Sequence, residues 1–272
     1  MKMNDIKTAP FMTKAIMLIS NMYRLGWDER NGGNLSYILY DQDINEFLDT
    51  TQVIRKIPIN FNARELRNKI FLVTGTGKYF KNVEYNPEEN LGVIQISEDG
   101  EYANLLWGFL DGGTFTSELP SHLMSHIERL KEDNHHRVVI HTHPTNLIAM
   151  TLIHELDEKS FTKTLWKLAT ECIVVFPEGV GVLPWMLCGN TDIGRATADK
   201  IKGFRACIWA AHGIFGTGTS LDETFGLIET IEKAAEIYML CQGQQIINSI
   251  TDDQLKAIAL AFKVKVKAGW LL

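Results

Sequence analysis

The chain has 272 residues, of which 45% are hydrophobic, enough to bury one large core, and we expect a single domain over residues 1–272. Its 33 acidic and 27 basic residues give a formal net charge of -6, which argues on electrostatic grounds against a nucleic-acid partner. A small metabolite is the better candidate for its ligand.

The N-terminal part is predicted to form one helix followed by several strands. Apolar residues near helical spacing mark the helix, and Gly32-Gly33 permits a turn before an alternating strand-like run. Asp99-Gly100 is typical of a hairpin turn. In chain order we expect a helix over residues 10–27, a strand over 35–40, an exposed excursion over 41–68, a strand and glycine-flanked turn within 69–80, and a hairpin over 90–109.

The rest of the chain alternates helices and strands. A helix with apolar residues at helical spacing should start near Ser117, and capping boxes at Ser220–Glu223 and Thr251–Gln254 should open the last two helices. Between them we expect a strand over 137–143, helices over 145–156 and 161–172, a strand and turn over 173–185, a helix over 191–204 and a strand over 206–218. The fold class is α/β, with helices around one sheet.

The stretch "RVVIHTHPTN" ends an apolar run with two histidines, His141 and His143. Side chains on a strand alternate with a period of two, so both rings should project to one face, close enough to share a metal ion. His212 in "WAAHGIFG" ends another apolar run and could complete a three-histidine site with an open coordination position, which indicates catalysis. The alternative is a pair of structural histidines whose ring nitrogens bind protein groups.

The other histidines have simpler interpretations. His122 and His126 have chelating i, i+4 spacing, but "HLMSH" lacks the glutamate of the zinc-protease motif, so we interpret them as helix-surface or packing residues. For His135, His136 and His154 solvated roles are the default. Four widely spaced cysteines, without a C-x-x-C pair, indicate reduced thiols rather than disulfides or a cysteine zinc site; they are Cys172, Cys188, Cys207 and Cys241.

Three stretches could bind an anion. "RNGGN" and "VTGTGKYF" offer backbone N–H groups beside glycines, although G-T-G alone is weak and a plain turn is the alternative for both. "TSELP" places Ser117 at a predicted helix N-terminus, where unpaired N–H groups favour an anion. Glu118 beside it is either a surface acid that favours the helix dipole or a functional carboxylate. No apolar run approaches the roughly 20 residues of a membrane helix and the N-terminus lacks a signal-peptide core, so we expect a cytoplasmic protein without a membrane partner.

Five motifs in this order, "DERNGGNLS", "VTGTGKYF", "TSELPSHL", "HTHPTN" and "AAHGIFG", resemble the class II aldolase/adducin family nearly from end to end. The resemblance implies a mainly antiparallel sheet with helices on both faces, and one zinc ion per subunit on His141, His143 and His212. It also implies that Glu118 moves a proton at the substrate carbon and can approach the zinc. Glu171 would reach the site of a neighbouring subunit in a homotetramer. The implied phosphate pocket consists of Asn31, Gly33, Asn34, Thr76, Gly77, Thr116 and Ser117.

By this resemblance the chain is a zinc-dependent aldolase that cleaves a ketose 1-phosphate into dihydroxyacetone phosphate and an aldehyde. The excursion over residues 41–68 matches the shorter members poorly and favours a branch of longer ones. Two alternatives stay open. One is another reaction on the same scaffold, namely cleavage of a different ketose phosphate or 4-epimerisation of a pentulose phosphate. The other is a non-catalytic adducin-like module, which the three histidines disfavour.

Overall fold

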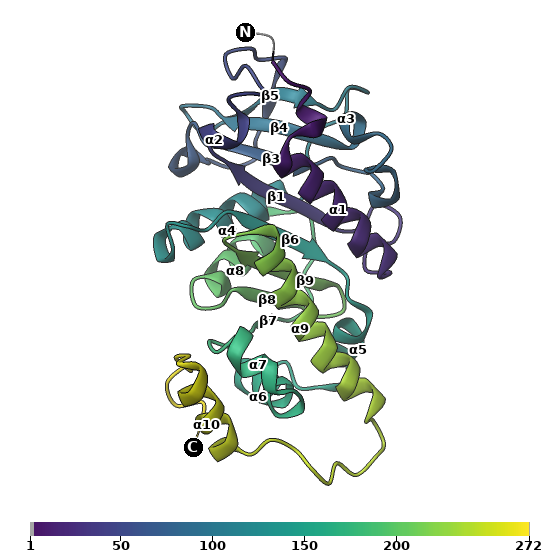
Figure 1. Cartoon of the computed structure of the whole chain (residues 1–272), viewed down its shortest axis with the longest axis vertical. Coiled ribbons are helices and arrows are strands. Elements are labelled where there is room, and N and C mark those ends of the chain that lie inside the picture. Colours follow the sequence, from purple (N-terminus) through teal and green to yellow (C-terminus); the bar gives the residue numbers. More distant parts are fainter. Residues whose placement is uncertain (1–2, 272) are drawn as a thin grey trace.

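A nine-stranded sheet forms the centre of the computed structural model, which describes residues 3–271 (Figure 1). Its strand order is β2-β5-β4-β3-β1-β6-β9-β8-β7, and neighbours run antiparallel except for the parallel pair β7 and β8. The predicted mainly antiparallel sheet is therefore confirmed. The strands are β1 (Asn34–Leu39), β2 (Arg55–Pro58), β3 (Ile70–Thr74), β4 (Leu91–Ile96), β5 (Tyr102–Gly108), β6 (Val138–Thr142), β7 (Gly181–Leu183), β8 (Ala206–Trp209) and β9 (Gly213–Gly218).

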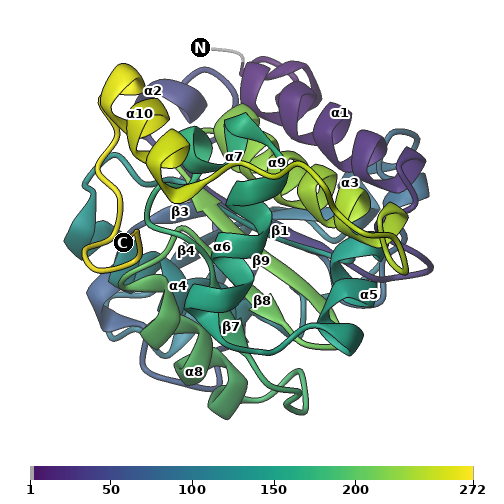
Figure 2. The ribbon, with the colours of Figure 1, turned by 90° about the horizontal axis from the view of Figure 1, so that it is seen from below.

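Helices cover both faces of the sheet, also as predicted (Figure 2). They are α1 (Pro10–Arg24), α2 (Asp41–Ile44), α3 (Pro87–Asn90), α4 (Leu119–Glu132), α5 (Thr145–Ile153), α6 (Glu158–Leu168), α7 (Thr170–Val175), α8 (Thr191–Ile201), α9 (Leu221–Leu240) and α10 (Asp252–Phe262). Short 3-10 helices lie at Ile6–Thr8, Arg64–Leu66 and Phe80–Asn82. None of the helices described over residues 3–271 is long and apolar enough to cross a membrane.

Alternation along the central strands divides the core between the two faces. On β1, Leu35 and Leu39 pack in the cluster that includes α1 and α9, whereas Ile38 packs with apolar residues of α4. On β6, Val138 belongs to the α9 side and Val139 to the cluster that includes α8. The face towards α4 and α8 is the one on which the histidines predicted to bind metal meet.

Several predicted elements were wrong in type or extent. The run over residues 173–185 is not one strand, because Ile173–Val175 completes α7 and only Gly181–Leu183 is a strand. The run over 206–218 is a hairpin of β8 and β9 rather than one strand. The excursion over 41–68 contains an edge strand, β2, which pairs with β5.

Two helix starts also differ from the prediction. Helix α4 begins at Leu119, and its N-cap residue is Glu118 rather than Ser117. At α9 the Ser220 side chain accepts from the Glu223 N–H as expected, but the Glu223 carboxylate binds Thr219 instead of closing the box on Ser220. The capping box at Thr251 is confirmed.

Candidate metal and acid-base site

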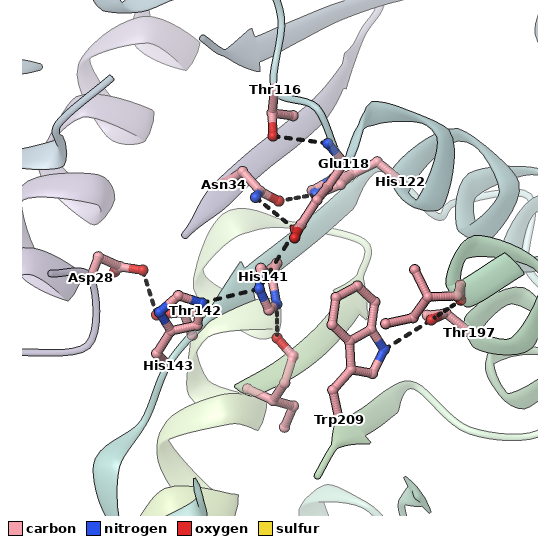
Figure 3. A network of polar contacts seen from close by, with 12 residues as sticks. Asp28, Asn34, Thr116, Glu118, His122, His141, Thr142, His143, Thr197 and Trp209 are labelled. Carbon is pink, nitrogen blue, oxygen red and sulfur yellow. Dashed lines mark hydrogen bonds and ion pairs between the residues drawn. The ribbon is translucent and has the colours of Figure 1, made fainter. Parts of the chain in front are cut away.

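Three histidine rings, from the end of β6 and from the β8–β9 hairpin, converge at the ends of these neighbouring strands. Figure 3 shows two of them, His141 and His143. His141 lies in β6, His143 directly follows it, and His212 lies in the turn between β8 and β9. The ring centroids are 5.0 Å apart for His141 and His143, 4.9 Å for His141 and His212, and 5.2 Å for His143 and His212. One ring nitrogen from each lies within 4.8 Å of the others, so the sequence pattern predicted the grouping correctly.

The hydrogen bonds of these rings fit a bound cation. His141 Nδ1 lies 3.1 Å from the Ile214 carbonyl oxygen, and His143 Nδ1 lies 3.2 Å from a Glu29 carboxylate oxygen. Because both partners are acceptors, each Nδ1 is the nitrogen that donates to the protein, which leaves each Nε2 as the nitrogen able to bind a cation. The two Nε2 atoms are 3.2 Å apart, close enough to bind one cation together.

Burial keeps the imidazoles in the form that binds metal. It lowers the pKa of His141 well below its ordinary value and that of His212 to about 4, with the neighbouring His143 acting in the same direction. Three imidazoles form a ligand set that suits zinc and leaves a coordination position open. His141, His143 and His212 can therefore hold a divalent cation.

Glu118 lies beside this cluster. Its Oε2 is 3.6 Å from His141 Nε2 and accepts a hydrogen bond of 2.9 Å from Asn34 Nδ2 (Figure 3). Burial raises the pKa of the Glu118 carboxyl, and the hydrogen bond from Asn34 opposes the shift. A carboxyl whose pKa is raised towards neutrality is suited to accept and return a proton.

The predicted anion-binding stretches meet on the same side of the site. The backbone N–H of Thr76 donates to the Thr114 carbonyl at 2.8 Å, and that of Thr116 donates to the Thr74 carbonyl at 2.9 Å, so the turn after β3 lies against the segment before α4. The hydroxyl of Thr74 accepts from the Leu35 N–H, which ties both segments to the start of β1. Asn31, Thr76, Gly77 and Ser117 are exposed, whereas Asn34 and Thr116 are buried. Their binding of phosphate stays a prediction.

Comparison with known proteins decides the family. The model of the "Class II Aldolase and Adducin N-terminal domain" matches residues 14–239. The chain belongs to this family. The resemblance of the five motifs is thus confirmed.

Curated relatives and solved structures agree with this placement. The chain is 57% identical over 268 residues to a rhamnulose-1-phosphate aldolase of Listeria innocua, with 98% of each chain covered. It is 53% identical over 268 residues to the same-named protein of Enterococcus faecalis, covering 98% of this chain and 96% of the relative. The crystal structure of a sugar-phosphate aldolase from Thermotoga maritima superposes with a TM-score of 0.73 at 27% identity, covering 86% of this chain and 96% of the other.

Glu171, predicted from the family resemblance, is exposed in the first turn of α7. It is absent from the groups of His, Cys, Asp and Glu that could hold a metal among residues 3–271. A role in the site of a neighbouring subunit therefore stays a prediction that one chain does not test.

Carboxylates behind the cluster were missed by the sequence reasoning. Glu29 binds His143, and Asp28 is buried and accepts from the Thr142 hydroxyl at 2.9 Å. Glu232 of α9 accepts from the Leu147 N–H at 2.8 Å at the start of α5, and so anchors the segment that follows His143. The sequence did contain one indication of the role of Glu232: it is a charged residue next to the apolar residues Ile228 and Ile231 of α9, which are also buried.

The remaining histidines differ in burial. His122 and His126 are fully buried packing residues of α4, one of the two roles expected for them, and His135 is exposed as expected. His136, predicted to be solvated, is 1% exposed and hydrogen-bonded to His126. The spacing of these histidines did not reveal that the face of α4 carrying them lies on β1.

Proposed function

We propose that this protein, as one domain over residues 1–272, is a class II aldolase that reversibly cleaves L-rhamnulose 1-phosphate to dihydroxyacetone phosphate and L-lactaldehyde in rhamnose breakdown. The observation that carries the proposal is the convergence of three imidazoles with a buried carboxyl, Glu118, 3.6 Å from the His141 ring. Near full-length relatives that bear the name rhamnulose-1-phosphate aldolase support the choice of substrate.

In the proposed enzyme His141, His143 and His212 hold one zinc ion per subunit. When bound, such an ion acts as a Lewis acid that draws charge from the substrate's carbonyl and neighbouring hydroxyl oxygens, which contributes several kcal/mol to the transition state. The Ile214 carbonyl orients the His141 ring and the Glu29 carboxylate orients the His143 ring, because each accepts from Nδ1. No lysine Schiff base is then required.

Glu118 transfers the proton at carbon. In the cleavage direction the bond between C3 and C4 breaks, its electron pair stays on C3, and the Glu118 carboxyl gives C3 a proton. In the synthetic direction the Glu118 carboxylate takes that proton back. General acid–base catalysis of this kind typically contributes about 10²–10⁴-fold in rate. The other proton is that of the C4 hydroxyl, whose oxygen becomes the aldehyde oxygen. We assign it to Glu171 of a neighbouring subunit in a homotetramer, which takes this proton in cleavage and returns it in synthesis.

The phosphate group would lie on the stretches that meet beside β1. Backbone N–H groups and hydroxyls there would hold it away from the reacting carbons, so that binding energy from the phosphate goes into orientation. The proposed pocket is Asn31, Gly33, Asn34, Thr76, Gly77, Thr116 and Ser117.

A coupled assay for dihydroxyacetone phosphate, run with L-rhamnulose 1-phosphate, L-fuculose 1-phosphate and L-ribulose 5-phosphate, tests substrate and reaction together. We expect fastest turnover of the rhamnulose phosphate, loss of turnover after chelation and recovery with zinc. An epimerase would release no free aldehyde. Full activity in metal-free protein would contradict the metal assignment, and a protein that neither binds zinc nor turns over any of the three would instead fit an adducin-like module.

A further inference from the structure

A chain of buried polar side chains leads away from Glu118 between α4 and the sheet. Asn34 donates from Nδ2 to Glu118, and its Oδ1 is hydrogen-bonded to His122 Nε2 (Figure 3). The Ser36 hydroxyl oxygen lies 2.7 Å from His122 Nδ1 and 2.8 Å from His126 Nε2. His126 Nδ1 lies 2.8 Å from His136 Nε2, which ends the chain.

These groups are removed from solvent. Ser36, His122 and His126 have no exposed surface, and His136 is 1% exposed. Burial lowers the pKa of His122 and of His136 to about 3 and that of His126 well below its ordinary value, so the three rings are neutral. A neutral imidazole has one donor and one acceptor nitrogen, which restricts how such a chain can be hydrogen-bonded.

The orientation of the Asn34 amide sets which group donates in each of these hydrogen bonds. Its amide nitrogen faces Glu118, so its carbonyl oxygen must accept from Nε2 of His122. The bare Nδ1 of His122 then accepts from the Ser36 hydroxyl, and the Ser36 oxygen accepts from Nε2 of His126. By the same reasoning His136 donates from Nε2 to His126. Each donor points towards Glu118, and hydrogen bonds aligned in this way strengthen one another.

We propose that His122, Ser36 and His126 are positioning residues that hold the Asn34 amide with its N–H group, rather than its carbonyl oxygen, towards the Glu118 carboxylate. The backbone of Asn34 is held in β1, but its terminal amide can turn over by rotation about one bond. Once turned over, the amide would place its oxygen against the carboxylate and lose the hydrogen bond. The inference rests on the proposed function, in which Glu118 moves the proton.

The hydrogen pattern can be measured without turnover. In full-length protein labelled with ¹⁵N-histidine and free of substrate, ring-nitrogen NMR should show His122 and His126 neutral with hydrogen on Nε2. Ser36→Ala should leave His122 as a mixture of both tautomers, because its Nδ1 loses the donor that selects one. A hydrogen on Nδ1 of His122 in the unmodified protein would overturn the proposal whether or not the protein is an aldolase.

Kinetic measurements then test whether these hydrogen-bonded side chains act on the reaction through Glu118. Ser36→Ala should lower kcat about tenfold with KM for the sugar phosphate unchanged, the scale of one hydrogen bond. It should cause no further loss in a Glu118→Gln background, since the two changes would act on the same step. The matched control is Ser125→Ala, which removes another fully buried hydroxyl on α4, next to His126. This hydroxyl donates to the Ser121 carbonyl at 2.8 Å and takes no part in the hydrogen bonds that lead to Glu118, so the variant should retain kcat. Equal losses in both serine variants, or a full additional loss in the Glu118→Gln background, would overturn the proposal.

A second pair of variants covers the case in which Ser36→Ala fails to fold. His122→Gln can still donate an N–H to Asn34, whereas His122→Leu cannot. We expect kcat of His122→Gln to exceed that of His122→Leu about tenfold at equal thermal stability. Equal kcat values in the two variants would remove His122 from any positioning role.

Discussion

Mild acid should destabilise this protein through its buried histidines. Burial lowers the pKa of His122 and His136 from 6.5 to about 3. Between these values the unfolded chain binds protons that the folded protein does not, so the free energy of unfolding falls as the pH falls through this window. Each of the two histidines should lower it by about 2 kcal/mol between pH 7 and pH 5. Together that is a large part of the roughly 5–15 kcal/mol typical of a folded protein.

The assay compares the unmodified protein with His136→Gln, which can still donate to His126 but does not titrate. Urea unfolding is followed by tryptophan fluorescence at several pH values, at one chain concentration and with excess chelator, so that metal binding adds no pH dependence of its own. Burial raises the pKa values of Asp28 and Glu118, so these two groups raise the free energy of unfolding as the pH falls. Their contribution is the same in both proteins and cancels when the two free energies are subtracted. The unmodified protein should lose about 2 kcal/mol more than the variant from pH 7 to pH 5. Parallel curves would refute the reasoning, because His136 would then titrate alike in both states.

Three further predictions test the site and its supports. Glu118→Gln should keep one zinc per chain by atomic absorption while kcat falls about 10²–10⁴-fold, and an unchanged kcat would remove Glu118 from catalysis. Thr76→Ala should mainly raise KM for L-rhamnulose 1-phosphate; an equal effect on unphosphorylated L-rhamnulose would reject the phosphate assignment. Gly33→Ala should lower the free energy of unfolding by about 2 kcal/mol more than Gly77→Ala in urea titrations. Both glycines have positive φ, +75° and +68°, but only at Gly33 would an added Cβ lie 1.8 Å from an Asp28 oxygen. Equal losses would show that the contact with Asp28 relaxes freely.

The fold was predictable where the hydrophobic pattern had one interpretation. The buried runs of β3 and β6 and the cap at Ser220 gave the right elements because strand composition, turn residues and capping agreed. Ile173–Val175 was assigned to a strand because a short run of β-branched residues suits a buried strand or a buried helix equally well. Its helical state depends on packing of α7 against α6, which directly precedes it, and against α9 and α10, which lie far along the sequence.

The sequence did not predict the hairpin of β8 and β9, for a different reason. Its turn contains Ala211 in a left-handed conformation with φ of +56°, a position where glycine or asparagine would have signalled a turn. His212 was nevertheless a candidate, because it follows the apolar run of β8, and it does lie beside His141 and His143. The three members of the group could therefore be named without the hairpin that places the third.

The hydrogen-bonded chain behind Glu118 was beyond prediction from local sequence. The i, i+4 spacing of His122 and His126 places both on one face of α4 but does not say what that face contacts. The contact is Ser36, 86 residues before His122 and 90 before His126, and it depends on where α4 lies across the sheet. The interpretation of the two rings as helix-surface or packing residues left both roles open, because helix spacing carries no information on tertiary position.

One strand register ties the proposed metal cluster to the proposed acid-base group. In the antiparallel pairing of β1 with β6, Asn34 stands directly opposite His141, so both side chains lie on the face towards α4. Asn34 donates to the same Glu118 oxygen that lies 3.6 Å from His141 Nε2, so the separation of carboxylate and cation site follows from that pairing. A slip of one residue would bring Leu35 opposite His141 and turn Asn34 to the other face of the sheet. Apolar residues on both sides of β1, Leu35 towards α1 and Ile38 towards α4, oppose such a slip, and in this way the core maintains the geometry of the chemistry.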